Sequence, residues 1–76
     1  MQIVDFLDEL TELIEADNAL TIETNLQELE EFDSLAVMSI IAYVDDKFDQ
    51  RLSSADLKAI ATVRDLLEKI GEANFS

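Results

Sequence analysis

The sequence predicts an all-α fold: a small four-helix bundle with a long first loop and a short third helix. Three stretches repeat apolar residues at the i, i+3, i+4 spacing of an amphipathic helix. Proline is absent and Gly71 is the only glycine, so Asp, Asn, Ser and Thr must build the turns. At 76 residues the chain is predicted to form one domain, residues 1–76, too small for an enclosed catalytic cleft beside its core.

The first helix is predicted from an apolar stripe that precedes Asp17 and Asn18, which are expected to end it. This stripe consists of Ile3, Phe6, Leu7, Leu10, Leu13 and Ile14. Residues 18–33 then form a long loop, and long ordered loops in small domains are often functional. Five isolated apolar residues are expected to anchor this loop to the core: Leu20, Ile22, Leu26, Leu29 and Phe32.

The second helix is predicted over residues 35–48, with residues 49–51 as its exit, and it has two apolar faces. One face is the stripe that a bundle core needs: Val37, Ile40, Ile41, Val44 and Phe48. The opposite face combines Leu35, Met38 and Ala42 with the polar residues Ser39, Asp46 and Asp49. Because a helix in so small a bundle cannot easily bury both sides, we expect this second face to be exposed and to bind protein partners.

The last two helices are predicted from their capping residues. Ser53 or Ser54 is expected to cap a short third helix that runs through Ile60, with Asp56 in its first turn. Thr62 is expected to cap the fourth helix, in which Asp65 stands at the capping-box position. The core stripe of the fourth helix is Val63, Leu66, Leu67 and Ile70, with Gly71 as a left-handed terminator.

The composition excludes several functions. The chain has no Cys and no His, which excludes disulfides, thiolate metal sites and self-contained Ser–His catalysis, and we predict that it is not an enzyme. Eighteen acids against five bases give a net charge of −13, which disfavours nucleic acid and anionic membranes and favours partners with basic patches. The first ten residues have no basic segment and no stretch approaches about 20 apolar residues, so we expect no signal peptide, no membrane insertion and a cytoplasmic protein.

Ser34, in the stretch "EEFDSLAVM", has two interpretations. Serine is a preferred helix N-cap, and Asp33 would complement the helix dipole. Alternatively, the hydroxyl is a point of covalent attachment. Separately from Ser34, the carboxylates of Glu30, Glu31 and Asp33 could form a magnesium or calcium site. Residues 17–28, however, lack the Gly and the regular spacing of a calcium-binding loop. We therefore predict no metal site.

The chain resembles the acyl carrier protein family, also called phosphopantetheine-binding carrier domains, over nearly its whole length. The resemblance is strongest over "EEFDSLAVMSIIAYVDDKFD", where Asp33-Ser34-Leu35 matches the family signature. It implies a bundle of acyl-carrier type in which Ser34 carries 4′-phosphopantetheine, donated from coenzyme A by a phosphopantetheinyl transferase. Asp33 and Leu35 would then be part of what the transferase recognises. The thiol of this group, which the chain itself lacks, would hold acyl or aminoacyl thioesters.

The sequence departs from the fatty-acid carrier pattern, which usually has acids where this chain has Ala36 and Ser39. The aromatic Phe32 before the signature is more similar to dedicated carriers, so we expect a stand-alone carrier of a specialised pathway in lipid or secondary-metabolite biosynthesis. We predict a monomer whose loading and transferring enzymes bind Leu35, Met38, Ser39, Ala42, Asp45, Asp46 and Asp49. The alternative is a non-enzymatic acidic interaction module in which Ser34 is only a helix N-cap.

Overall fold

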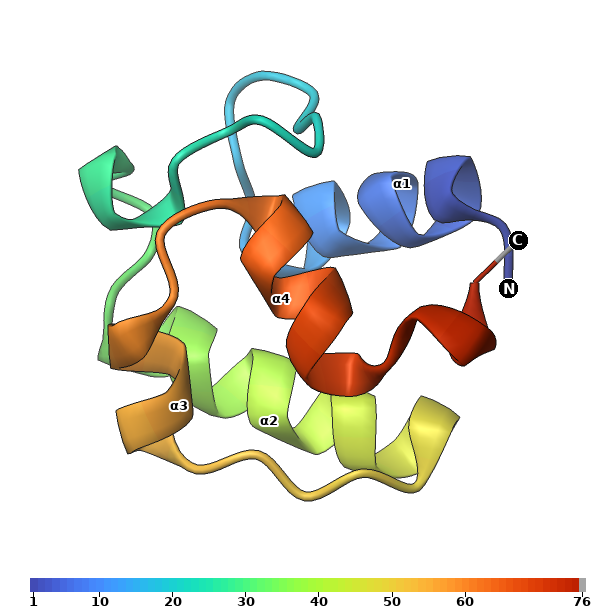
Figure 1. Cartoon of the computed structure of the whole chain (residues 1–76). Coiled ribbons are helices and arrows are strands. Elements are labelled where there is room, and N and C mark those ends of the chain that lie inside the picture. Colours follow the sequence, from blue (N-terminus) through green and yellow to red (C-terminus); the bar gives the residue numbers. More distant parts are fainter. Residues whose placement is uncertain (76) are drawn as a thin grey trace.

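The computed structural model describes residues 1–75, and over this range the chain forms four α-helices and two short 3₁₀-helices but no β-strand (Figure 1). The elements are α1 (Ile3–Leu13), η1 (Leu26–Glu28), α2 (Ser34–Phe48), α3 (Ser54–Ala59), α4 (Val63–Ile70) and η2 (Glu72–Asn74). The predicted all-α four-helix bundle, with a long first loop and a short third helix, is confirmed. The two 3₁₀-helices were not predicted.

One hydrophobic core joins all four α-helices and the first loop. In Figure 1, α4 crosses in front of α1 and α2, and α3 lies beside the beginning of α2. The core stripes predicted for α1, α2 and α4 point inward as expected. The buried residues are Phe6, Leu10, Ile14, Leu20, Leu26, Ala36, Val37, Ile40, Val44, Leu57, Ile60, Val63, Leu66, Leu67 and Ile70.

Helix α1 ends at Leu13, so the predicted stop at Asp17 and Asn18 is wrong by several residues. The chain leaves the helix through a Schellman motif, in which Glu15 takes a positive φ of 55°. Its two hydrogen bonds run from Glu15 N–H to the Glu12 carbonyl (3.2 Å) and from Ala16 N–H to the Thr11 carbonyl (3.0 Å). Because this motif usually has Gly at the position of Glu15, the sequence pattern gave no sign of it.

The N-terminal caps predicted for α3 and α4 are confirmed, and the C-terminal cap of α4 differs in its conformation. Ser53 with Asp56, and Thr62 with Asp65, form reciprocal capping boxes at the two helix starts. Gly71 does end α4, but with φ 113° and ψ 121° it is not in the predicted left-handed helical region. The side-chain amide of Asn74 donates to the Ile70 carbonyl (3.1 Å), so a residue in η2 satisfies part of the helix end.

The first loop is fixed to the rest of the protein by hydrogen bonds as well as by apolar side chains. The N–H groups of Val63 and Arg64, in the first turn of α4, donate to the carbonyls of Thr24 (3.1 Å) and Ile22 (2.9 Å). In the other direction, Leu26 N–H donates to the Ala61 carbonyl (2.8 Å). The loop therefore satisfies helix N–H groups that would otherwise lack a partner, and its path toward residue 34 is well defined.

An aromatic cluster packs together the end of the bundle that lies far from the beginning of α2. Phe6, Tyr43, Phe48 and Phe75 pack with ring centroids 5.1–6.2 Å apart, mostly in edge-to-face geometry. Through its contacts with Phe6 and Phe48, Phe75 packs the residues after α4 against α1 and α2. Burial and a hydrogen bond to Glu9 raise the pKa of Tyr43 to about 12.

Candidate functional site

Asp33, not Ser34, caps helix α2. Its backbone is extended (φ −98°, ψ −172°), and its Oδ1 accepts a hydrogen bond from the N–H of Ala36 at 2.9 Å. Ser34 is the first helical residue, one position too late for a side-chain oxygen to reach the N–H three residues after the cap. The interpretation of Ser34 as a helix N-cap is therefore wrong. Both residues are good cap formers, and the backbone geometry selects Asp33.

The Ser34 hydroxyl is accessible. The residue is exposed, and its Oγ makes no hydrogen bond to any residue in the described range 1–75. Most other hydroxyls have a structural task, for example Thr11, Ser53 and Thr62, which all bond backbone groups. A free hydroxyl at the head of a rigid helix can be approached by an external enzyme without any rearrangement of the fold.

A groove of about 590 Å³ lies beside this hydroxyl, between the first loop, α2 and α3. Phe32, Val37 and Met38 give it an apolar lining, and Lys58 from α3 contributes a positive charge. The remaining lining residues are Gln27, Asp33, Ser34 and Ser54. A flexible substituent on Ser34 therefore has an apolar surface next to its point of attachment.

Gln27 connects two walls of this groove by hydrogen bonds. Its side-chain amide donates to the carbonyls of Leu57 (2.9 Å) and Ile60 (2.8 Å) at the C-terminal end of α3. These contacts hold η1 of the first loop against α3, and so fix two of the three walls of the groove relative to each other. Sequence reasoning missed Gln27, Ser54 and Lys58, because nothing local in the chain marks residues that meet only after folding.

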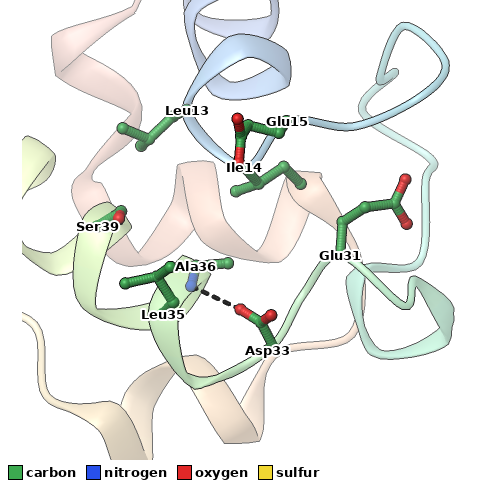
Figure 2. A pocket seen from close by; sticks show the side chains of 8 residues that line it. All are labelled: Leu13, Ile14, Glu15, Glu31, Asp33, Leu35, Ala36 and Ser39. Carbon is green, nitrogen blue, oxygen red and sulfur yellow. Dashed lines mark hydrogen bonds between the residues drawn. The ribbon is translucent and has the colours of Figure 1, made fainter.

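A second groove, of about 350 Å³, lies on the other side of the α2 start, where α1 ends (Figure 2). Figure 2 shows Leu13, Ile14, Leu35 and Ala36 around its interior, with Glu15 and Glu31 at its edge. Asp33 and Ser39 complete the lining. Hydrogen bonds from the backbone N–H groups of Asp17 (3.1 Å) and of Glu31 itself lower the pKa of Glu31.

The second face of α2 is open to solvent, as predicted. Leu35 is 72% exposed and Met38 is 68% exposed, and Ala42 is also exposed. On the core side of the same helix, Ile40 and Val44 are fully buried. That the exposed face binds partners stays a prediction.

The predicted partner residues extend along the whole helix. Asp45, Asp46 and Asp49 are exposed at its C-terminal end, and Asp49 caps that end in the left-handed conformation (φ 53°). Ser39 is half-buried and faces the second groove. Helix α2 has 15 residues and is therefore about 22 Å long, so a partner that contacts both Ser34 and the acidic end must cover most of its length.

No helix within residues 1–75 is long and apolar enough to cross a membrane. In the same part of the chain, no group of three or more Asp or Glu residues is arranged so that it could hold a metal ion. The carboxylates Glu30, Glu31 and Asp33, considered above as oxygen ligands, do not form such a group.

Comparison with known protein families gives a match over most of the chain. The sequence model of the family described as "Phosphopantetheine attachment site" matches residues 2–70, which is most of the chain. No curated protein and no solved structure matches it significantly. The family match covers all four α-helices and both sides of the Ser34 site.

Proposed function

The chain belongs to the phosphopantetheine attachment-site family, whose members carry a covalently attached 4′-phosphopantetheine group, and from this premise we propose that Ser34 bears it. The proposal rests above all on the exposed Ser34 hydroxyl, which makes no hydrogen bond within residues 1–75 because Asp33 provides the cap of α2. The apolar groove beside it adds support, since a long substituent on Ser34 can lie there. Asp33 and Leu35 flank the hydroxyl and would help a transferase to recognise it.

The attachment reaction needs an enzyme from outside. Ser34 Oγ attacks the phosphorus of coenzyme A that is bonded to the pantetheine unit, an Oγ–P bond forms, and the P–O bond to the departing 3′,5′-ADP breaks. The hydroxyl proton would go to a base of the transferase, because no carboxylate within residues 1–75 is hydrogen-bonded to Ser34 Oγ and the chain has no His. When attached, the group supplies the thiol that holds a thioester.

We infer a carrier role without catalysis for this chain. Acyl or aminoacyl groups would be loaded, modified and released by partner enzymes that bring their own catalytic residues. Residues 34–40, the first two turns of α2, contain no acidic residue, and Ala36 and Ser39 stand where the fatty-acid carrier pattern usually has acids. This apolar beginning supports a dedicated set of partners in a specialised pathway.

Intact-protein mass spectrometry tests the proposal. After incubation with coenzyme A and a broad-specificity phosphopantetheinyl transferase, we expect a mass gain of about 340 Da, the covalent mass of one group. Fragmentation should place the added mass on Ser34. The alternative function, an acidic interaction module, is favoured by the net charge of −13 and predicts no gain with a transferase that modifies a known carrier in the same reaction.

The acidic end of α2 should steer partners toward the site. Asp46→Lys is expected to lower the association rate with a partner enzyme by roughly threefold or more at low salt, because exposed charges act mainly on encounter. Stopped-flow binding at several salt concentrations measures this effect, which should fade as salt screens it. Asp8→Lys, an equal charge change on the exposed side of α1, is the control. Equal slowing by both variants would contradict a role for this end of α2.

A further inference from the structure

Among residues 1–75, Lys58 is the one basic residue that lines the groove of about 590 Å³ beside Ser34. It lies in the last turn of α3, which Figure 1 shows beside the beginning of α2. Ser54, one helical turn earlier, lines the same groove, so this face of α3 is turned toward it. The Lys58 ammonium group makes no ion pair in the described part of the chain. Its charge is therefore available to an anion in the groove.

The backbone on both sides of Lys58 is held in place. Leu57 is fully buried in the core, and its carbonyl accepts a hydrogen bond from the Gln27 side-chain amide at 2.9 Å. The same amide donates to the Ile60 carbonyl at 2.8 Å. The main chain of Lys58 is therefore a fixed part of the groove wall, while its flexible four-carbon stem can bring the ammonium group toward Ser34.

A 4′-phosphopantetheine group on Ser34 would add negative charge at an acidic place. Its phosphodiester is ionised at neutral pH and is bonded directly to Ser34 Oγ, whereas the pantetheine part is uncharged. Asp33 lines the same groove, and the whole chain has a net charge of −13. The partial positive charge at the beginning of α2 favours a phosphate, but Asp33 already uses it by accepting from Ala36 N–H. Lys58 supplies a full positive charge on the other wall of the groove.

We propose that Lys58 binds the phosphodiester of the group on Ser34 by a charge-assisted hydrogen bond, an inference that rests on Ser34 being the attachment site. The contact directs the first atoms of the arm toward α3 and so along the groove, past Val37 and Met38. Because Lys58 is exposed, the pair should be favoured only roughly two- to fivefold over its open form. A partner enzyme can therefore draw the arm away without breaking a strong bond.

Nuclear magnetic resonance of the modified protein tests this contact. The lysines of the chain are Lys47, Lys58 and Lys69, so isotope-labelled lysine gives one set of side-chain signals for each. We expect the modification to shift the Lys58 signal and to leave those of Lys47 and Lys69 in place. Lys58→Gln should in turn shift the phosphorus resonance, and Lys58→Arg, which keeps the charge, should not move it as far. Both shifts should fade as salt screens the pair.

Urea unfolding separates this contact from an ordinary role of Lys58 at the end of α3, where a lysine also stabilises the helix dipole. The dipole effect is the same in the unmodified and modified proteins, whereas the contact exists only after modification. Lys58→Gln should therefore raise the unfolding equilibrium constant roughly two- to fivefold more in the modified protein than in the unmodified one. Thermal unfolding of the unmodified variant verifies that it folds.

Lys47→Gln is the matched control. Lys47 is also an exposed lysine in the last turn of a helix, at the end of α2 that is far from Ser34, and its loss should affect both forms equally. A shift of the Lys58 signal alone, with a larger loss of stability in the modified protein, supports the proposal. The proposal is overturned if no lysine signal moves, if all move alike, or if Lys58→Gln affects both forms equally. Each measurement uses protein whose mass gain on Ser34 is verified, so these outcomes differ from a failure of attachment.

Discussion

Ser34→Ala is expected to reduce the mass gain in the attachment reaction from one whole group of about 340 Da to none. The reason is covalent: alanine has no oxygen to form the bond to phosphorus. The fold should be unaffected, because Ser34 is exposed and Asp33 caps the helix, while alanine is the best helix former. Intact mass spectrometry after a long incubation with excess transferase measures the result, and circular dichroism verifies the helical content.

Ser54→Ala is a closely matched control for this experiment. Ser54 is also exposed, is also the first residue of a helix that begins after its cap, and lines the same groove as Ser34. It differs in its neighbours, since it lacks the Asp and Leu that flank Ser34. We expect Ser54→Ala to gain the full mass. A gain that persists in Ser34→Ala, or that disappears in Ser54→Ala, would show that a different hydroxyl is modified.

The parts of the fold that depend on local sequence were predictable. Amphipathic periodicity located three of the four α-helices, capping residues located the short third one, and the capping boxes at Ser53 and Thr62 follow from residues three positions apart. One of the two interpretations of Ser34 made it the cap of α2, although Asp33 is the cap. Two adjacent residues with equal capping ability cannot be distinguished by type, because the choice depends on where the incoming loop turns. That path is set by contacts with α3 and α4, which no local pattern contains.

The candidate site divides in the same way. Asp33, Ser34 and Leu35 are consecutive, so a signature in the sequence predicted them together. The walls of the two grooves come from segments far apart in the chain, such as Glu15 with Leu35, or Gln27 with Lys58. The position of Glu15 also depends on a positive φ that residues of its type seldom adopt. These parts required the folded structure.

Leu26→Ala is expected to lower the free energy of unfolding by about 2–5 kcal/mol, the loss typical of a fully buried leucine. Leu26 lies in the long loop, yet it is fully buried, and its N–H donates to the Ala61 carbonyl. The adjacent Gln27 bonds α3 through Leu57 and Ile60. Since small domains are stable by only about 5–15 kcal/mol in total, this one change should remove a large part of the stability.

Urea unfolding measures this effect, and Leu35→Ala provides the control because it makes the same chemical change on a side chain that is 72% exposed. Leu35→Ala should alter the free energy of unfolding by no more than about 0.5 kcal/mol. If both variants unfold at the same urea concentration, Leu26 does not anchor the loop. If Leu26→Ala alone is destabilised, the loop that leads to Ser34 belongs to the core, and the position of the hydroxyl is set by the same contacts that hold the bundle together.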